Sequence, residues 1–331
     1  MITHEENYFR TIEFRYPEWI ICSVGLMPAT WNKYREDLED LVIRHPLIFG
    51  EQRKNPNREY GDFGGTYKEG THTDNWGCVW QNISGGLDAL VVEHPLSDWS
   101  KLDTFVPPTS GGLPHGFMYM RLYFLRGFEN LMIDFAEDPP ELHKLIDMVL
   151  NYNMSEVKKV LANKPKIVHF GDDLGNQTSL PMSPEHFRKY LKPCYKKIFG
   201  ACRDTGAHVY LHSDGHILEI IGDLVECGVT VINPQIRANT LDGLVKTCSE
   251  ASPTPKAYGK GKVAVNLDLD RQLFPFCTPE EIDEHVREAV VKLGAKEGGL
   301  MLTAECEPDV PLENIAAICQ ALEKYRLYYN R

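Results

Sequence analysis

Two predicted strands in this 331-residue chain end in side chains that commonly bind metal ions. His212 and Asp214 follow one strand, and Glu305 and Cys306 follow the last strand. Zinc accepts imidazole, thiolate and carboxylate ligands, and parallel barrel strands end at one common face. We therefore expect one zinc ion per chain, bound by His212 and Cys306. Asp214 or Glu305 is expected to supply a further ligand.

Each of these residues also has a simpler interpretation. His212 could be a buried histidine at a strand end. Asp214 lies two residues further on, so its side chain should point the same way as that of His212. It could be a ligand, a catalytic carboxylate that orients His212, or a turn residue before Gly215. A free cysteine is often a small buried hydrophobe, but the two glutamates that flank Cys306 indicate that it stays outside the apolar core.

Other polar residues lie on or directly after predicted strands. Asp172 and Asp173 could hydrogen-bond a substrate or act as acid or base, and the alternative is a turn. We expect both to be catalytic. His169, Asn233 and Asn266 are expected to bind the substrate, because active sites of parallel barrels lie at the carboxyl ends of the strands.

The segment Phe49–Gly86 is rich in glycine, asparagine and aromatic residues and is too long for an ordinary connection, which indicates an insertion. Its aromatic part, Tyr60–Trp80, could line the mouth of a pocket, with Trp76 and Trp80 in contact with substrate. It could equally be a hairpin packed over the rest of the fold.

Short strands alternate with helices over the second half of the chain, which predicts parallel strands joined by helical crossovers. The predicted strands are 19–24, 166–170, 207–211, 229–233, 262–267 and 299–304. The predicted helices are 31–45, 129–161 with a new start at 138–141, one beginning at 183, 217–227, 241–250, 278–293 and 311–325. We therefore expect a single-domain (β/α)8 TIM barrel over residues 1–331, with an N-terminal extension and the insertion. Neither GxGxxG nor GxxxxGK[ST] occurs, so a nucleotide-binding sheet is not indicated.

Composition excludes several classes of protein. The formal net charge of -12 disfavours binding to nucleic acid, since a phosphate backbone would be repelled. The N-terminus lacks the pattern of a signal peptide, and no apolar run is long enough to span a membrane. Nine scattered cysteines without a CxxC pair indicate reduced thiols. A cytoplasmic protein is therefore expected.

Several short motifs resemble those of the uroporphyrinogen decarboxylase superfamily, and more narrowly its branch of corrinoid-dependent methyltransferases. The resemblance covers most of the chain and rests on segments 73–80, 93–99, 126–130, 171–175, 212–215 and 308–315. It implies a (β/α)8 barrel with its site at the carboxyl ends of the strands.

Two departures from the family pattern narrow the expected activity. The decarboxylases carry an arginine-rich N-terminal segment that pairs with substrate carboxylates, whereas Ser23–Pro28 contains no arginine here. The methyltransferase branch binds zinc through a His-x-Cys pair and a later cysteine. His212 and Cys306 match the outer positions, and Asp214 replaces the middle cysteine, which makes a more Lewis-acidic ion.

The resemblance therefore implies a zinc-dependent methyltransferase. The methyl group would move from a small O- or N-methylated donor to a corrinoid, carried by a separate protein, or to a similar acceptor. The alternatives are a decarboxylase or lyase acting on a smaller substrate, and a barrel that has lost its activity. A homo-oligomer is compatible with the sequence.

Overall fold

The computed structural model describes residues 2–250 and 263–330, so the first residue of the predicted strand 262–267 lies outside the described part. These residues form two compact units, and each is described by itself. The first lies within Met1–Glu69, Asn82–Asp88 and Pro234–Arg331, and the second within Gly70–Gln81 and Ala89–Asn233.

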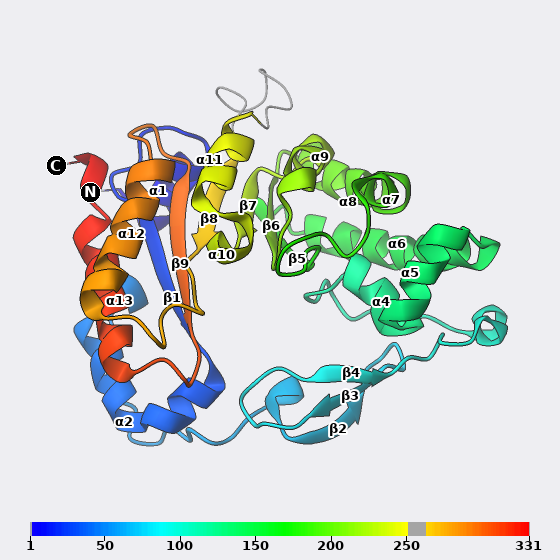
Figure 1. Ribbon diagram of the computed structural model, residues 1–331, viewed down its shortest axis with the longest axis horizontal. Helices are drawn as coiled ribbons and strands as arrows, with labels where there is room; N and C mark the ends of the chain where they lie inside the picture. Colours follow the sequence, from blue (N-terminus) through cyan, green and yellow to red (C-terminus); the bar gives the residue numbers. More distant parts are fainter. Residues whose placement is uncertain (1, 251–262, 331) are drawn as a thin grey trace. The chain divides into compact units, whose positions relative to one another are not determined.

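The first unit contains three parallel strands in the order β1-β9-β8 (Figure 1). Its strands are β1 (Ile21–Leu26), β8 (Ala264–Asp268) and β9 (Leu300–Cys306). Its helices are α1 (His4–Ile12), α2 (Pro28–Arg44), α3 (Pro46–Phe49), α10 (Ile236–Asn239), α11 (Leu241–Glu250), α12 (Pro279–Leu293) and α13 (Leu312–Tyr325), with 3₁₀ turns at Gly65–Tyr67 and Tyr328–Asn330. Helices α12 and α13 pack side by side, and α13 contacts β1 and β9.

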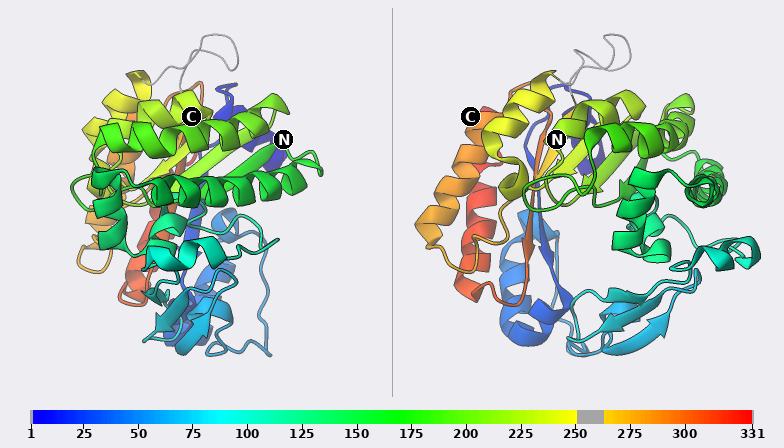
Figure 2. Two further views of the ribbon diagram at one scale, coloured as in Figure 1. Left: turned by 90° about the vertical axis from the view of Figure 1, so that its right-hand side faces the viewer. Right: turned by 45° about the vertical axis from the view of Figure 1, so that its right-hand side comes forward.

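The second unit contains three parallel strands in the order β7-β6-β5, and a separate sheet in the order β2-β3-β4. Its strands are β2 (Gly70–Thr73), β3 (Val79–Asn82), β4 (Leu90–Glu93), β5 (Ile167–Gly171), β6 (His208–Ser213) and β7 (Val231–Pro234). Its helices are α4 (Tyr119–Arg126), α5 (Phe128–Glu137), α6 (Pro140–Leu161), α7 (Pro184–His186), α8 (Lys192–Asp204) and α9 (Ile221–Cys227), with 3₁₀ turns at Trp99–Thr104 and Leu218–Ile220 and a π-helical turn at Phe187–Leu191. Helix α8 contacts β6 and packs between α6 and α9 (Figures 1 and 2).

Local sequence signals explain where several helices begin. The Thr278 hydroxyl accepts a hydrogen bond from the backbone of Glu281, whose side chain bonds back to Thr278, a capping box at the start of α12. The Ser183 hydroxyl accepts a hydrogen bond from the backbone N–H of His186 and so caps α7, before Pro184. Asp138 adopts a left-handed conformation between α5 and α6, so the expected break at this point is confirmed.

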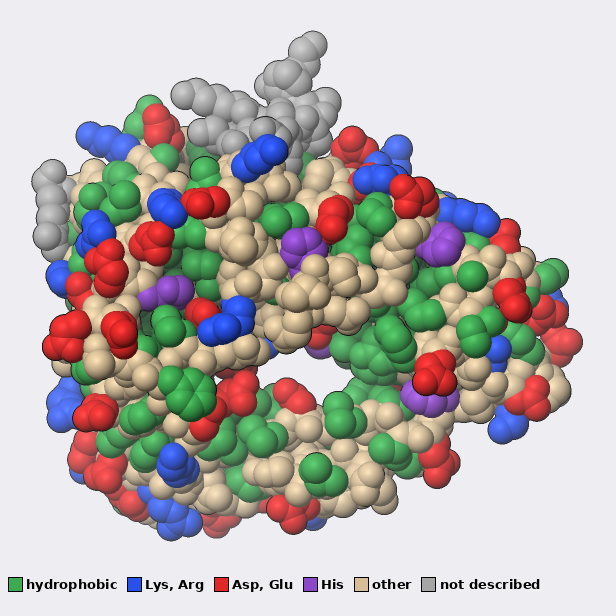
Figure 3. Space-filling model, in the orientation of Figure 1, with side chains coloured by type: hydrophobic (Ala, Val, Ile, Leu, Met, Phe, Trp, Pro, Cys, Tyr) green, Lys and Arg blue, Asp and Glu red, His purple; other side chains and the backbone are tan. Residues whose placement is uncertain are grey.

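The predicted α/β class, with parallel strands connected through helices, is confirmed. Strand β3, which lies within the expected insertion 49–86, pairs antiparallel with β4, which follows the insertion. All nine cysteines are free, as their spacing predicted. Within the described residues, no helix has both the length and the apolar character needed to cross a membrane. On the face drawn in Figure 3, acidic side chains lie among basic ones rather than beside a large basic area.

Candidate metal and catalytic site

Successive side chains of a strand point to opposite faces of the sheet. In the second unit, this alternation decides which polar side chains lie on the partly exposed face and which are buried. Along β5 and the residue after it, Val168, Phe170 and Asp172 are buried. Asp173 and His212 are partly exposed, because they have the other parity of β5 and β6. The two adjacent aspartates therefore lie in different environments, although the sequence gives them the same apparent role.

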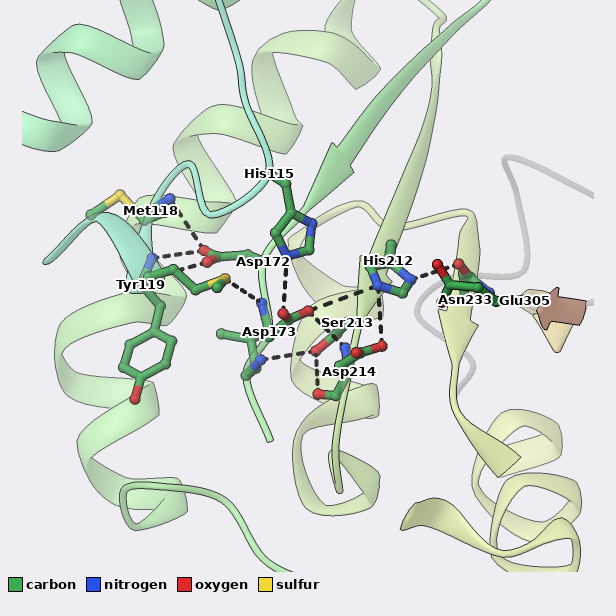
Figure 4. Close-up of polar contacts among 12 residues, drawn as sticks. His115, Met118, Tyr119, Asp172, Asp173, His212, Ser213, Asp214, Asn233 and Glu305 are labelled. Carbon is green, nitrogen blue, oxygen red and sulfur yellow. Dashed lines mark hydrogen bonds and ion pairs between the residues drawn. The ribbon is translucent and has the colours of Figure 1, made fainter. Parts of the chain in front are cut away.

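Three side chains of this unit form a cluster that could hold a metal ion: His115, Asp173 and His212 (Figure 4). Their ligand atoms all lie within 4.8 Å of one another. His115 Nε2 donates a hydrogen bond of 2.9 Å to Asp173 Oδ2, and His212 Nε2 lies 3.8 Å from Asp173 Oδ1. Asp173 is thus the carboxylate that joins the two imidazoles.

His212 is held on both sides of its ring. Its Nδ1 donates a hydrogen bond of 2.7 Å to Asn233 Oδ1, and its Nε2 lies 3.2 Å from Asp214 Oδ1. The predicted direction of the Asp214 side chain is confirmed. Burial lowers the pKa of His212, but the hydrogen bond to Asp214 and the charges of Asp214 and Asp173 outweigh this effect and raise it to about 9. His212 is therefore an imidazolium at neutral pH in the metal-free protein.

His115 is subject to the same two opposing effects. Burial lowers its pKa, but the hydrogen bond to Asp173 and the charges of Asp173 and Asp172 together outweigh burial, so that the pKa of His115 lies above its ordinary value. Binding of a metal ion through Nε2 of both histidines would release these protons, since only a neutral imidazole is a ligand.

The loops after β5 and β6 fit tightly against each other. The backbone N–H of Asp214 donates to Asp173 Oδ1 at 2.9 Å, and that of Leu174 donates to the Ser213 hydroxyl at 2.9 Å. A Cβ atom on Gly215 would lie 2.2 Å from the carbonyl carbon of Gly175. Both glycines are therefore required by the close approach of two backbones. The segments 171–175 and 212–215 together form one structural element.

Asp172 is fully buried, and its carboxylate accepts hydrogen bonds from the start of α4. Oδ2 accepts from the backbone N–H of Tyr119 at 2.7 Å and from the Tyr195 hydroxyl at 2.6 Å. Oδ2 also accepts from Met118 at 3.2 Å, and Oδ1 from Met120 at 2.9 Å. Burial raises the pKa of Asp172, against the hydrogen bonds that favour its charged form. These contacts turn Asp172 away from the cluster that Asp173 joins.

His115 is the member of the cluster that the sequence did not predict. It lies in the connection before α4 and follows Gly111 and Gly112, and the element that precedes this connection is the 3₁₀ turn Trp99–Thr104, not a strand. The predictions relied on strand ends, so a histidine inside a loop gave no signal. Its place beside His212, with ring centroids 5.6 Å apart, is decided by tertiary contacts alone.

The other predicted substrate-binding residues of this unit have different surroundings. His169 is exposed, two residues before Gly171, and its ring lies 4.7 Å from that of Tyr210. Trp76 is 3% exposed and packs edge-on against Tyr152. Trp80 donates from Nε1 to Asp74, as Trp76 does from its backbone N–H. The two tryptophans thus donate to one carboxylate, and their predicted contact with substrate stays a prediction.

The remaining predicted site residues belong to the first unit. Cys306 is 0% exposed, so the expectation that its flanking glutamates keep it outside the core is wrong. Alternation along β9 explains the result, because Cys306 has the parity of buried Ala304 and Glu305 has the parity of partly exposed Thr303. Burial, followed by the charges of Cys319 and Glu305, raises the pKa of the Cys306 thiol.

Glu305 and Asn266 lie on the partly exposed face of β9 and β8. Glu305 pairs with Arg271. Asn266 Oδ1 accepts a hydrogen bond of 3.0 Å from the Thr303 hydroxyl. Their predicted roles, in metal and substrate binding respectively, stay predictions.

The cluster of His115, Asp173 and His212 offers donor atoms that zinc accepts. Two imidazole nitrogens and one carboxylate oxygen are a common three-residue ligand set for zinc, which leaves the fourth position open for a substrate atom. Asn233 would fix the tautomer of His212 by accepting from Nδ1, a role that a second partner of a ligand histidine usually has. The residues present therefore fit a zinc ion.

Comparison with known proteins gives a family and a fold. The family model described as uroporphyrinogen decarboxylase (URO-D) matches residues 119–325. No curated protein matches the chain. A solved methyltransferase from Methanosarcina mazei is similar at a TM-score of 0.62 and 16% identity, over 98% of this chain and 99% of its own. A dihydropteroate synthase from Xanthomonas albilineans, solved with 4-aminobenzoic acid, reaches 15% identity over 48% of this chain and 52% of its own. Its TM-score is 0.30.

Proposed function

The chain belongs to the uroporphyrinogen decarboxylase family, as its motifs predicted, and from this premise we propose that it is a zinc-dependent methyltransferase. The methyl group comes from a small O- or N-methylated donor. The acceptor is a corrinoid carried by a separate protein, or a similar nucleophile. The observation that carries the proposal is the cluster of His115, Asp173 and His212 at the ends of parallel strands. The similarity in fold to a methyltransferase over nearly the whole chain supports it.

We propose His115, Asp173 and His212 as the zinc ligands, with Asp214 as a further ligand or as the carboxylate that holds His212. Bound zinc would supply Lewis acidity to the leaving oxygen or nitrogen of the donor. Cys306 and Glu305 form the alternative ligand set predicted from the sequence. The (β/α)8 barrel remains our proposal for the complete fold.

The residues of the second unit have separate tasks in the proposed reaction. The bond between the donor heteroatom and the methyl carbon breaks, its electron pair stays on the heteroatom, and the acceptor forms a new bond to carbon. The heteroatom then takes a proton from water. Asp173 is the aspartate of the 172–173 pair that faces the cluster, and as a proposed zinc ligand it would be ionised, so we assign it hydrogen bonding to the donor and not the supply of the proton. His169, exposed on the neighbouring part of β5, would contact the donor.

Zinc content tests both ligand sets in one series. The full chain, purified without chelator, should contain about one zinc ion, measured by elemental analysis. His115→Ala and His212→Ala should lose it, and Cys306→Ala should keep it if our preferred set is right. His169→Ala is the matched control, because it removes an imidazole that lies outside the cluster. Zinc lost in Cys306→Ala and kept in His115→Ala would support the sequence-predicted set instead.

A transfer assay then tests the reaction. Methoxylated and N-methylated donors are incubated with the zinc-loaded protein and reduced cobalamin, and methylcobalamin is followed by absorbance. His212→Ala should abolish formation of methylcobalamin. Release of carbon dioxide from carboxylated substrates, without methyl transfer to any acceptor, would contradict the proposal and support the lyase alternative.

A further inference from the structure

The position of His115 needs an explanation, because no helix or strand contains it. It is followed by Gly116, whose backbone N–H donates a hydrogen bond of 2.7 Å to the carbonyl oxygen of Gly171 on β5. Helix α4 begins at Tyr119, only four residues after His115. Contacts that hold this short segment against β5 therefore also place the imidazole.

Asp172 provides three more of these contacts. The backbone N–H groups of Met118, Tyr119 and Met120 all donate to its carboxylate. These groups lie at the start of α4, where N–H groups have no partner within the helix. The Tyr195 hydroxyl holds the same carboxylate from α8. Asp172 thus connects α8 and the end of β5 to the segment that follows His115.

Gly171 affects His115 directly, because the absence of a side chain at Gly171 leaves room for the His115 imidazole. A Cβ atom at this position would lie 2.5 Å from His115 Nδ1. This distance is too short for a non-bonded carbon and nitrogen, so the imidazole or the backbone would have to move. Its φ lies outside the left-handed region, so alanine would suit the backbone. The obstacle to a side chain at Gly171 is therefore the imidazole itself, a side chain that is 47% exposed and that an added Cβ would displace.

We propose that Gly171, Asp172 and Tyr195 are positioning residues that set the place of His115 beside Asp173 and His212. The effect on zinc rests on the proposed function, in which His115 is a ligand. Asp172 then acts through the segment before α4 and does not touch the donor, which differs from the catalytic role predicted from the sequence. This role agrees with its complete burial and its four donors.

Two conservative variants with matched controls test the inference. Gly171→Ala removes no hydrogen bond but fills the space of the imidazole, and Gly200→Ala is its control, because a Cβ at Gly200 meets nothing within 4 Å. Tyr195→Phe removes the hydroxyl that holds Asp172. Tyr190→Phe is its control, because the Tyr190 hydroxyl bonds the Asp138 carboxylate instead.

Zinc affinity, measured by competition with a chromophoric chelator, should fall about 10-fold to 100-fold in Gly171→Ala and Tyr195→Phe. Both controls should keep the affinity of the original protein. In a His115→Ala background, where Asp173 and His212 remain and the weakened binding is measured with a weaker chelator, Gly171→Ala should cause no further loss. An equal further loss in that background would overturn the inference, because Gly171 would then act through another residue.

Two measurements on the metal-free protein separate this inference from the proposed function. Carbethoxylation of His115, mapped by mass spectrometry, should be faster in Gly171→Ala than in Gly200→Ala. Amide exchange at Met118–Met120 should be faster in Tyr195→Phe than in Tyr190→Phe. Unchanged rates in both test variants would overturn the positioning role. Changed rates in a protein that binds no zinc would support positioning and refute the proposed function alone.

Discussion

Gly215→Ala should destabilise the protein by about 2 to 5 kcal/mol. Two costs add at this position. Gly215 has φ +81, and an L-residue in the left-handed region costs about 1 to 2 kcal/mol. Its Cβ would also lie 2.2 Å from the backbone carbonyl carbon of Gly175, which cannot rotate away, and such overpacking costs about 1 to 3 kcal/mol.

Two control variants separate the two costs. Gly206→Ala has a similar φ of +85 with nothing within 4 Å of the added Cβ, so it should lose only the strain, about 1 to 2 kcal/mol. Gly200→Ala, inside α8 with open space around it, should stabilise by about 0.5 to 1 kcal/mol.

The free energy of unfolding is measured by urea denaturation of the metal-free protein, followed by circular dichroism at constant pH. From the most to the least stable, the expected order is Gly200→Ala, the original protein, Gly206→Ala and Gly215→Ala. A loss in Gly215→Ala no larger than that in Gly206→Ala would refute the reasoning, because the loops after β5 and β6 would then not be in obligatory contact.

Three further predictions concern charge and substrate. In the metal-free protein, His212 has a pKa near 9 against an ordinary 6.5, so its ion pairs should stabilise the fold fully below pH 6.5 and lose this effect as the pH rises through 9. Urea denaturation from pH 6 to 10 should show this dependence, worth about 3 kcal/mol, and a His212→Gln variant should lack it. Asp74→Asn should cost about 3 to 5 kcal/mol in the same assay, because Arg121 is 5% exposed and would lose its ion pair, whereas exposed Asp62→Asn should be neutral. The protein should not convert uroporphyrinogen, since Ser23–Pro28 supplies no arginine for its carboxylates; formation of coproporphyrinogen at an enzymatic rate, detected by chromatography, would contradict this.

The sequence determined the local structure of this protein well. Hydrophobic runs with capping signals such as Thr278 and Ser183 predict their strands and helices, because these patterns act between residues close in the chain. The same locality explains why His212 and Asp214 were correctly expected to point the same way. The motifs also predicted the family.

Tertiary structure decided which chemical groups meet. His115 lies 58 residues before Asp173, in a loop without regular structure, and only packing against β5 brings it to the cluster. The parity of Asp172 and Cys306 within their strands could not be read from their polar neighbours, since both lie at strand ends where either face was plausible. Burial of one face and exposure of the other is a property of the packed sheet. This difference between the two faces gives the neighbouring aspartates different roles: Asp173 contacts the two histidines, and Asp172 accepts hydrogen bonds from the backbone at the start of α4.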